Sequence, residues 1–300
     1  MSDPVDMVAA GAEAEASASR GLERLEQNRG RVYYRAEADS AARDAYYAHI
    51  DLEASPADLF ANLSALLQVT HQRPLNYRPA EELYPWVDLH PDGLLHHIYS
   101  GRAVEPAEVI KDDADRAHRR AERIRQVLEQ NPDLQPAERA AASHAIGQDL
   151  RFNCEHVVPQ SWFGRDEPMR GDLHHLFTCE PHCNSRRGSS PFADLSDTLQ
   201  RMAECGRSSN EGFEPHEGKG PVARATLYFL LRYPGQIGNA MAEMQTSTMA
   251  VLVDWDQHPV DEYERHRNAA IHEAQGNRNP LIDHPGLAER VDFGAGFGQL

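Results

Sequence analysis

The sequence predicts an α+β protein, mainly helical, that folds as a single domain around a small irregular unit in its middle. Segments with helical periodicity occupy both halves of the chain, and prolines at their starts and glycines at their ends bound several of them. From Arg151 to Phe192 this periodicity is absent, and β-prone residues and turn residues replace it. The 300 residues suffice for a sizeable core, and they contain no internal repeats.

The first elements follow from caps and apolar spacing. Residues 1–35 are rich in alanine and glutamate with few apolar residues, so we expect a disordered or frayed segment there. A helix is expected in "ADSAARDAYYAHID", where the folded part begins. The next helix starts with Ser55 as its N-cap and Pro56 in its first turn. A proline-rich loop and the short strand "GLLHHIYSGR" complete this part.

Long helices surround the irregular middle. "PAEVIKDDADRAHRRAERIRQVLEQNPD" predicts the longest helix, and we expect its charged run to be a solvated face rather than a DNA-binding face. "QPAERAAASHAIG" predicts a second helix. After Lys219 the helical pattern returns in "PVARATLYFLLRY", "EMQTSTMAVLVDWD" and "PVDEYERHRNAAIHEAQG", the last of which ends at Gly276.

The charge balance limits the function classes. The formal net charge of −17 excludes a protein that coats nucleic acid through overall positive charge. From Arg151 to Arg187, however, five basic and five acidic residues cancel, so a bound divalent cation would make this region positive. An enzyme that acts on nucleic acid therefore stays compatible with the composition.

Apolar runs are too short to cross a bilayer, and no secretory signal is recognisable at the N-terminus. We therefore expect no membrane association, and the localisation is left open. Four cysteines cluster in the middle third of the chain, too few for a disulfide scaffold. A structural Zn²⁺ site, disulfides and free thiols are all compatible with their spacing; these cysteines are Cys154, Cys179, Cys183 and Cys205.

Candidate catalytic residues lie in "FNCEHVVPQSW" and "CNSRRG". Glu155 and His156 are adjacent on an apparent strand that stops at a proline. A carboxylate and the amide oxygen of Asn184 are hard ligands of the kind that bind Mg²⁺, while waters and phosphate complete the octahedron. A neutral histidine beside such a metal can deprotonate a water for attack on phosphorus. Arg187, three residues after Asn184, would lie on the same side of a helix and could hold a phosphate.

The segments "NCEHVVPQSWF", "MRGDLHHLF" and "CNSRRGSSPF" together resemble the bacterial endonuclease I family of sugar-nonspecific nucleases, which carry a ββα-metal (His-Me finger) motif. The resemblance continues in "FEPHEGKGPVARATLYFLLRYPG" and "YERHRNAAIHEAQGNRNPLIDHP". It implies a nuclease domain over residues 36–295 with a ββα-metal core at about 150–195. It also implies secreted or periplasmic relatives.

The resemblance assigns roles to individual residues. His156 matches the general base, and Glu155 and Asn184 match the ligands of a catalytic Mg²⁺. Arg170 and Arg187 are candidates for phosphate contacts. The implied reaction is hydrolysis of phosphodiester bonds in DNA, with RNA as an alternative substrate, by a chain that we expect to be a monomer.

Competing interpretations use the same residues differently. A nucleic-acid-binding module that has lost catalysis would lack Glu155, His156 or Asn184, and all three are present. A hydrolase built on Cys154 with His156 or His174 would need a third group to orient the histidine, and the sequence offers none. The metal-dependent nuclease is therefore the favoured hypothesis.

Overall fold

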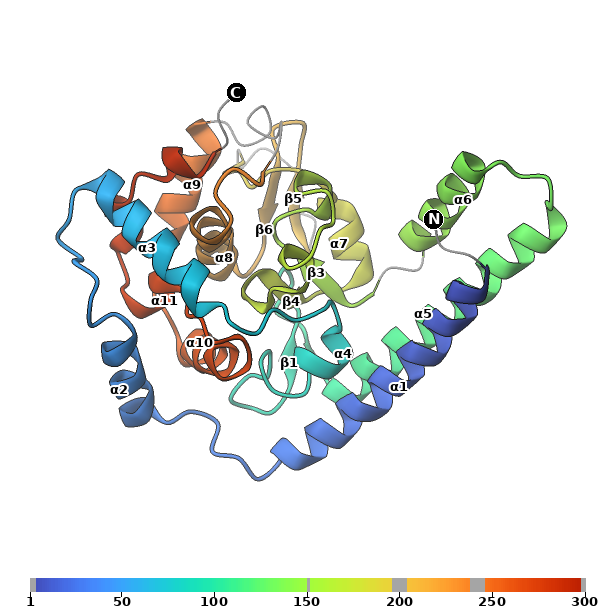
Figure 1. Ribbon diagram of the computed structural model, residues 1–300, viewed down its shortest axis with the longest axis horizontal. Helices are drawn as coiled ribbons and strands as arrows, with labels where there is room; N and C mark the ends of the chain where they lie inside the picture. Colours follow the sequence, from blue (N-terminus) through green and yellow to red (C-terminus); the bar gives the residue numbers. More distant parts are fainter. Residues whose placement is uncertain (1–3, 150–151, 196–203, 238–245, 298–300) are drawn as a thin grey trace.

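Helices form most of the structure, and short paired strands accompany them, so the α+β class is confirmed. The computed structural model describes residues 4–149, 152–195, 204–237 and 246–297. A rounded body carries a long arm of three helices (Figure 1). No helix in these ranges is both long and apolar enough to span a membrane.

Two ends of the body helices lie where the sequence predicts them, at Ser55 and Gly276, whereas the helix expected to start at Pro259 starts at Glu262. Ser55 accepts a hydrogen bond from the backbone N–H of Asp58, which satisfies one unpaired donor of the first turn. Gly276, with φ of 97°, ends the helix that precedes it in the left-handed conformation that favours glycine. The body helices are α2 (Ala36–Tyr46), α3 (Pro56–Thr70), α4 (Pro79–Glu82), α7 (Pro181–Arg187), α8 (Lys219–Arg232), α9 (Thr246–Asp256), α10 (Glu262–Gln275) and α11 (Pro280–Asp283).

Three antiparallel strand pairs lie among these helices. They are β1 (Leu95–His96) with β2 (Ala103–Val104), β3 (Cys154–His156) with β4 (Leu176–Thr178), and β5 (Gly206–Ser208) with β6 (Phe213–Pro215). In the middle pair Cys154 faces Thr178 and His156 faces Leu176. Helix α8 runs through the main hydrophobic core, and eleven of its residues are buried.

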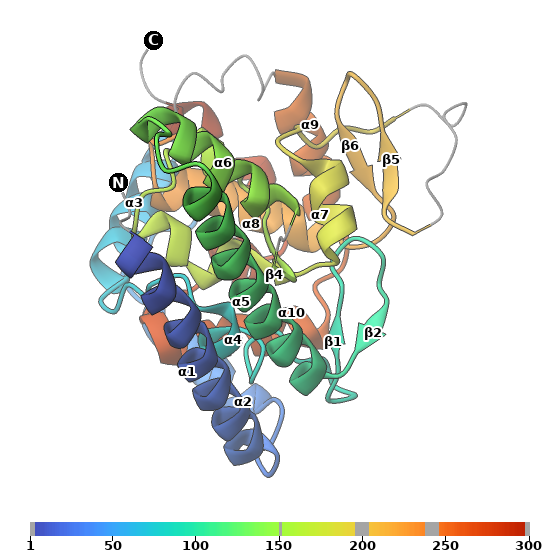
Figure 2. The same cartoon turned by 90° about the vertical axis from the view of Figure 1, so that its right-hand side faces the viewer.

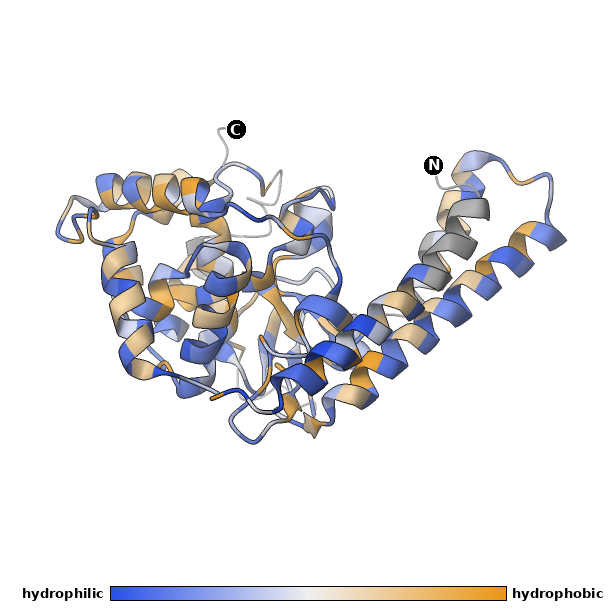
Figure 3. Cartoon of the chain, turned by 60° about the horizontal axis from the view of Figure 1, so that its bottom comes forward, coloured by the Kyte–Doolittle hydropathy of each residue, from blue (hydrophilic) through white to orange (hydrophobic). Residues whose placement is uncertain are grey.

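The arm consists of α1 (Pro4–Asn28), α5 (Pro106–Gln130) and α6 (Pro136–Asp149). Helix α1 lies antiparallel beside α5, and α6 folds back toward them (Figures 1 and 2). Along the arm, hydrophobic and hydrophilic residues are interspersed (Figure 3). A second hydrophobic cluster, which includes Ala18, Tyr84 and Ile110, anchors the base of the arm to the body.

The N-terminal segment differs from the expected disordered or frayed stretch, because residues 4–28 form the continuous helix α1. Its packing combines small residues and ion pairs with the apolar side chains of Leu22 and Leu25, which lie against the second hydrophobic cluster. A Cβ atom on Gly21 would lie 2.0 Å from the carbonyl oxygen of Ala80, so only glycine permits this close approach. Arg20 adds an ion pair with Glu81 at 2.9 Å.

Candidate active site

Two short strands followed by a short helix position the candidate residues. Strand β3 carries Glu155 and His156, and it pairs with β4, after which Pro181 starts helix α7. Helix α7 lies against β3, because Asn184 Nδ2 donates to the carbonyl oxygen of Cys154 at 2.9 Å. Residues 30 positions apart in the sequence are thus brought into contact.

His156 is buried, with 6 % of its surface exposed. Its Nε2 lies 3.0 Å from the carbonyl oxygen of Arg170, and its Nδ1 lies 3.3 Å from Nε2 of Gln160. The ring also packs on Tyr77, with 4.9 Å between the ring centroids. Sequence reasoning missed both Gln160 and Tyr77. The position of Gln160 in a short turn directly after Pro159 was the available signal for that residue.

These contacts define the protonation state of His156. Burial first, and then the neighbouring His175, lower the pKa of His156 well below its usual 6.5, so the ring is neutral at pH 7. A carbonyl oxygen only accepts hydrogen bonds, so Nε2, which faces Arg170, carries the proton. The lone pair is then on Nδ1, which accepts from the Gln160 amide. A neutral imidazole held in this tautomer can act as a base through Nδ1.

Glu155 contacts a different set of residues. Its carboxylate accepts a hydrogen bond from the Tyr99 hydroxyl at 2.7 Å and lies 3.4 Å from Nη1 of Arg187. The side chains that contact Glu155 differ from those that contact His156, as expected where successive residues of a strand alternate. Convergence of Glu155 and His156 on one metal ion stays a prediction.

The donor set fits a hard cation. Nδ2 of Asn184 is directed at Cys154, so Oδ1 is the atom that suits a metal ion. Together with the Glu155 carboxylate it offers two oxygen ligands, the small protein contribution typical of Mg²⁺ sites. Glu155, 2 % exposed, is a buried carboxylate held by a hydroxyl and a guanidinium, which keep it oriented.

Arg187 is almost fully buried, with 1 % of its surface exposed. Its guanidinium donates to the carbonyl oxygen of Val157 at 2.7 Å and to that of His156 at 3.5 Å. The same group forms the ion pair with Glu155. This placement favours a role in positioning Glu155 and strand β3 over direct contact with a phosphate.

Arg170 is half-exposed and lies on the other side, next to His156. Its Nε donates to Oε1 of Gln160 at 3.2 Å, and its guanidinium stacks on Tyr77 at 4.8 Å. An ion pair with Glu167 is long, at 3.8 Å. The side chain is therefore available to a phosphate in a way that Arg187 is not.

The turn between the two strands is held by a buried carboxylate. Asp172 accepts hydrogen bonds from Tyr228 and Tyr233 through Oδ2 and from Gln275 through Oδ1. Burial by itself would raise the pKa of Asp172, but nearby histidines, first His71, and these donors lower it below its usual range. The carboxylate is therefore ionised, and it ties the turn to helices α8 and α10.

A second buried ion pair fixes strand β4, and the sequence did not reveal it. Asp88 accepts from the backbone N–H of Thr178 at 2.7 Å and pairs with Arg267. Arg267 also donates to the carbonyl oxygens of Leu173 and Leu176. Only tertiary structure brings Asp88 and Arg267 together, since they are 179 residues apart.

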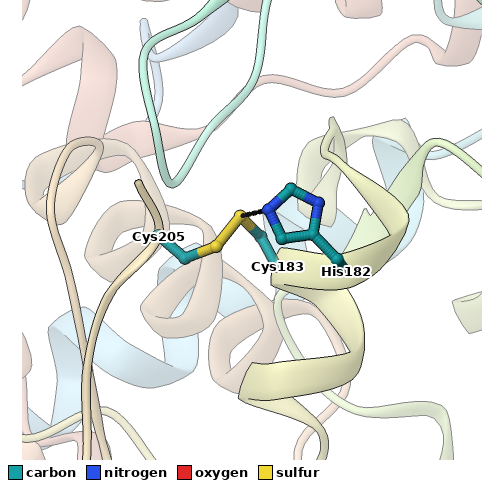
Figure 4. Close-up of side chains that lie close together, drawn as sticks. All are labelled: His182, Cys183 and Cys205. Atoms are coloured by element: carbon teal, nitrogen blue, oxygen red, sulfur yellow. Dashed lines mark hydrogen bonds between the residues drawn. A yellow bond between two sulfur atoms is a disulfide. The ribbon is translucent and has the colours of Figure 1, made fainter. Parts of the chain in front are cut away.

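The state of the four cysteines argues against a structural Zn²⁺ site. Cys183 and Cys205 form a disulfide, while Cys154 and Cys179 are buried free thiols. His182 lies 3.4 Å from the Cys183 sulfur (Figure 4). In the described part of the chain, this trio is where three His, Cys, Asp or Glu donor atoms come together. Because both sulfurs are bonded to each other, they are not thiolate ligands, and the four-cysteine zinc site is not supported.

Comparison with known proteins identifies relatives of this arrangement. The family model "Endonuclease I" matches residues 109–286, more than half of the chain. An "Extracellular ribonuclease" of Bacillus subtilis (strain 168) is 36 % identical over 155 residues, which cover 47 % of this chain and 54 % of that protein. An "Extracellular ribonuclease" of Bacillus amyloliquefaciens is 35 % identical over 173 residues, or 53 % and 60 % of the two chains.

An "Extracellular deoxyribonuclease" of Aeromonas hydrophila is 31 % identical over 157 residues, which cover 44 % of this chain and 66 % of that protein. A "Periplasmic deoxyribonuclease" of the same organism is 29 % identical. The chain thus spans little more than half the length of the Bacillus relatives that it matches. Because the family model covers more than half of its residues, the chain belongs to the endonuclease I family.

Proposed function

We propose that the chain is a metal-dependent endonuclease that hydrolyses phosphodiester bonds of DNA, with RNA as an alternative substrate. The observation that carries this proposal is the buried, neutral His156, held with its lone pair on Nδ1 and adjacent to the carboxylate of Glu155. The relatives, which are named as ribonucleases and deoxyribonucleases, support the same substrate class.

In this proposal β3, β4 and α7 are the ββα-metal motif, and Glu155 and Asn184 hold Mg²⁺. When bound, the cation supplies Lewis-acid stabilisation of charge on the phosphate and the leaving 3′ oxygen. His156 accepts a proton from the attacking water at Nδ1, and Arg187 keeps Glu155 in place. Arg170 contacts a phosphate next to the one that is cleaved.

The test is plasmid and RNA cleavage by purified protein, with Mg²⁺ and with EDTA. We expect EDTA to abolish cleavage. His156→Ala should lower kcat by at least about 100-fold, because a positioned general base contributes about that much or more. Asn184→Ala should raise the Mg²⁺ concentration needed for half-maximal activity.

A matched control is His118→Ala, because His118 is an exposed histidine on the arm helix α5. It should cleave like the wild type. Full activity of His156→Ala would refute the assignment of the base. Tight DNA binding by the wild type without any turnover would instead indicate a catalytically silent binding module.

A further inference from the structure

A groove of about 1200 Å³ runs between the arm and the body. Helices α1, α5 and α6 form its walls, and residues from Tyr77 to Ala80 form part of its floor. Tyr77 and Arg170 line the groove, and both also contact His156. The groove therefore begins beside the candidate base and extends along the arm, whose direction is visible in Figures 1 and 3.

Arginines gather along this groove although the whole chain is strongly acidic. Arg120, Arg139 and Arg170 line it, and Arg165 lies near enough to act on Arg120 electrostatically. Burial first, and then the charges of Arg170 and Arg165, lower the pKa of Arg120. For Arg120, Arg139 and Arg165 no ion pair exists with any residue of the described ranges. Their positive charge is not neutralised within this part of the protein.

Two carboxylates also line the groove, and both have partners. Glu13 pairs with Arg78 at 3.2 Å and with Arg20 at 3.1 Å. Asp113 accepts hydrogen bonds from Tyr84 and Asn153, and burial raises its pKa to about 6. Neither Glu13 nor Asp113 forms an ion pair with Arg120, Arg139 or Arg165, so within the described residues these acids give the three arginines no direct counter-ion.

Much of the remaining wall is apolar, with Ser17, Ser143 and Arg78 among it. Its apolar residues include, from facing sides of α5 and α6 and the loop between them, Ala117, Ala121, Ile124, Leu128, Leu134 and Ala140. Half-buried Phe152 and Tyr77 add aromatic surface at the body side. The groove thus combines arginines with apolar and aromatic contact surface.

We propose that this groove binds a single-stranded flank of the nucleic-acid substrate, with phosphates on Arg120, Arg165 and Arg170 and with bases against the apolar wall. The inference rests on the proposed nuclease function and specifies its substrate form. Proteins that bind single strands combine a positive track for the backbone with apolar or aromatic surface for the bases. A duplex keeps its bases stacked inside, so it would leave the apolar wall facing sugars and phosphates.

The test compares a dinucleotide with a single strand of about a dozen nucleotides, long enough to occupy a groove of this kind. The variant is Arg120→Gln combined with Arg165→Gln, which removes two charges and keeps a polar side chain at each position. We expect kcat/KM for the long strand to fall about tenfold or more, because each charge-assisted hydrogen bond contributes about that much. Cleavage of the dinucleotide should not change.

A second readout is binding without turnover. In His156→Ala protein, the two arginine changes should weaken binding of a labelled long single strand. They should also reduce the slope of log affinity against log salt by about 1.4, since each lost phosphate contact on a single strand removes about 0.7. Replacing Arg120 with Lys instead of Gln keeps the positive charge and should retain most of the affinity for the long strand. A loss of affinity caused by misfolding would not depend on the charge in this way.

The matched control is Arg119→Gln, the same charge change on the neighbouring exposed residue of α5, outside the groove. Suppose that the wild type cleaves both substrates while the double variant and Arg119→Gln have the same kcat/KM for the long strand. In that case the groove inference is wrong and the nuclease function stands. The groove inference would also be wrong if the double variant lost more kcat/KM on duplex DNA than on single strands. If the wild type cleaves neither substrate, the nuclease function itself fails.

Discussion

At the scale of single residues, the most informative arrangement is a closed chain of hydrogen bonds around His156. Arg170 Nε donates to Gln160 Oε1, Gln160 Nε2 donates to His156 Nδ1, and His156 Nε2 donates to the Arg170 carbonyl oxygen. Each bond determines the direction of the next, so the amide orientation of Gln160 and the tautomer of His156 are fixed together. Gln160 is thus a positioning residue.

Gln160→Met tests this role, because methionine keeps the length and removes both polar atoms. We expect kcat to fall roughly fivefold with KM nearly unchanged, since the ring of His156 loses a hydrogen bond that contributes about 1 kcal/mol to its orientation. Steady-state cleavage kinetics measure the effect. Gln126→Met, at an exposed glutamine of α5, is the control, and a wild-type kcat in Gln160→Met would contradict the prediction.

At the scale of elements, α7 is the weakest part of the site by itself. Its seven residues are too few for a helix that is stable in isolation. Asn184 and Arg187 bind it to strand β3 on one side. On the other side the Cys183–Cys205 disulfide links it to the residue before β5, across a separation of 22 positions.

Removing this link should destabilise the protein. For Cys183→Ser combined with Cys205→Ser, the free energy of unfolding should fall by about 2–4 kcal/mol, the typical contribution of a disulfide. Urea unfolding followed by tryptophan fluorescence measures it. Reductant should destabilise the wild type similarly and leave the double variant unchanged. A double variant as stable as the oxidised wild type would show that α7 needs no covalent tether.

At the scale of the whole molecule, buried histidines are the dominant titrating feature. Burial lowers the pKa of His90 and of His97 from 6.5 to about 4. The pKa of His174 falls to about 3 for the same reason. Lowered pKa values are also found for His71, His156, His175, His266, His272 and His284.

These groups make the fold sensitive to acid. Below about pH 6.5 the unfolded chain protonates its histidines while the folded protein does not, so stability falls as the pH decreases from about 6.5 to about 4. Asp113, Asp256 and Glu264 act in the opposite sense, because burial raises their pKa values, to about 6 for the two aspartates, and the folded state binds those protons first. The nine histidines outnumber these three acids.

We therefore expect the urea midpoint at about pH 5 to lie clearly below that at about pH 7, at constant ionic strength. Replacing His90 with Gln should reduce the difference. Equal or greater stability at the lower pH would refute this account. The monomeric state expected from the sequence, and the domain limits 36–295, stay predictions at this scale.

Local signals predicted several elements well. The Ser55 cap, the start at Pro56 and the end at Gly276 are confirmed, because these depend on a few adjacent residues. The strand that carries Glu155 was recognisable for the same reason. Local patterns fail where the apolar residues of a helix are few, as in α1, where Leu22 and Leu25 and the close approach at Gly21 hold the helix against the rest of the protein.

The sequence indicated the residues of the candidate site but not the buried contacts that hold them in place. Glu155, Asn184 and Arg187 lie together at β3 and α7, as their types and the family resemblance suggested. The phosphate contact expected of Arg187 could not be weighed from the sequence, since burial depends on the whole fold. The Asp88–Arg267 pair was equally inaccessible, because no local pattern links distant residues.

The dependence of the β3–β4 turn on helix α10 and the segment after it has a consequence during synthesis. Gln275, Arg267 and Asn277 contact the turn near Asp172 and His174. A nascent chain acquires these residues long after the turn itself has left the ribosome. The candidate site can therefore assemble only after residues 267–277 have been made, so chains that stop before them would lack these contacts.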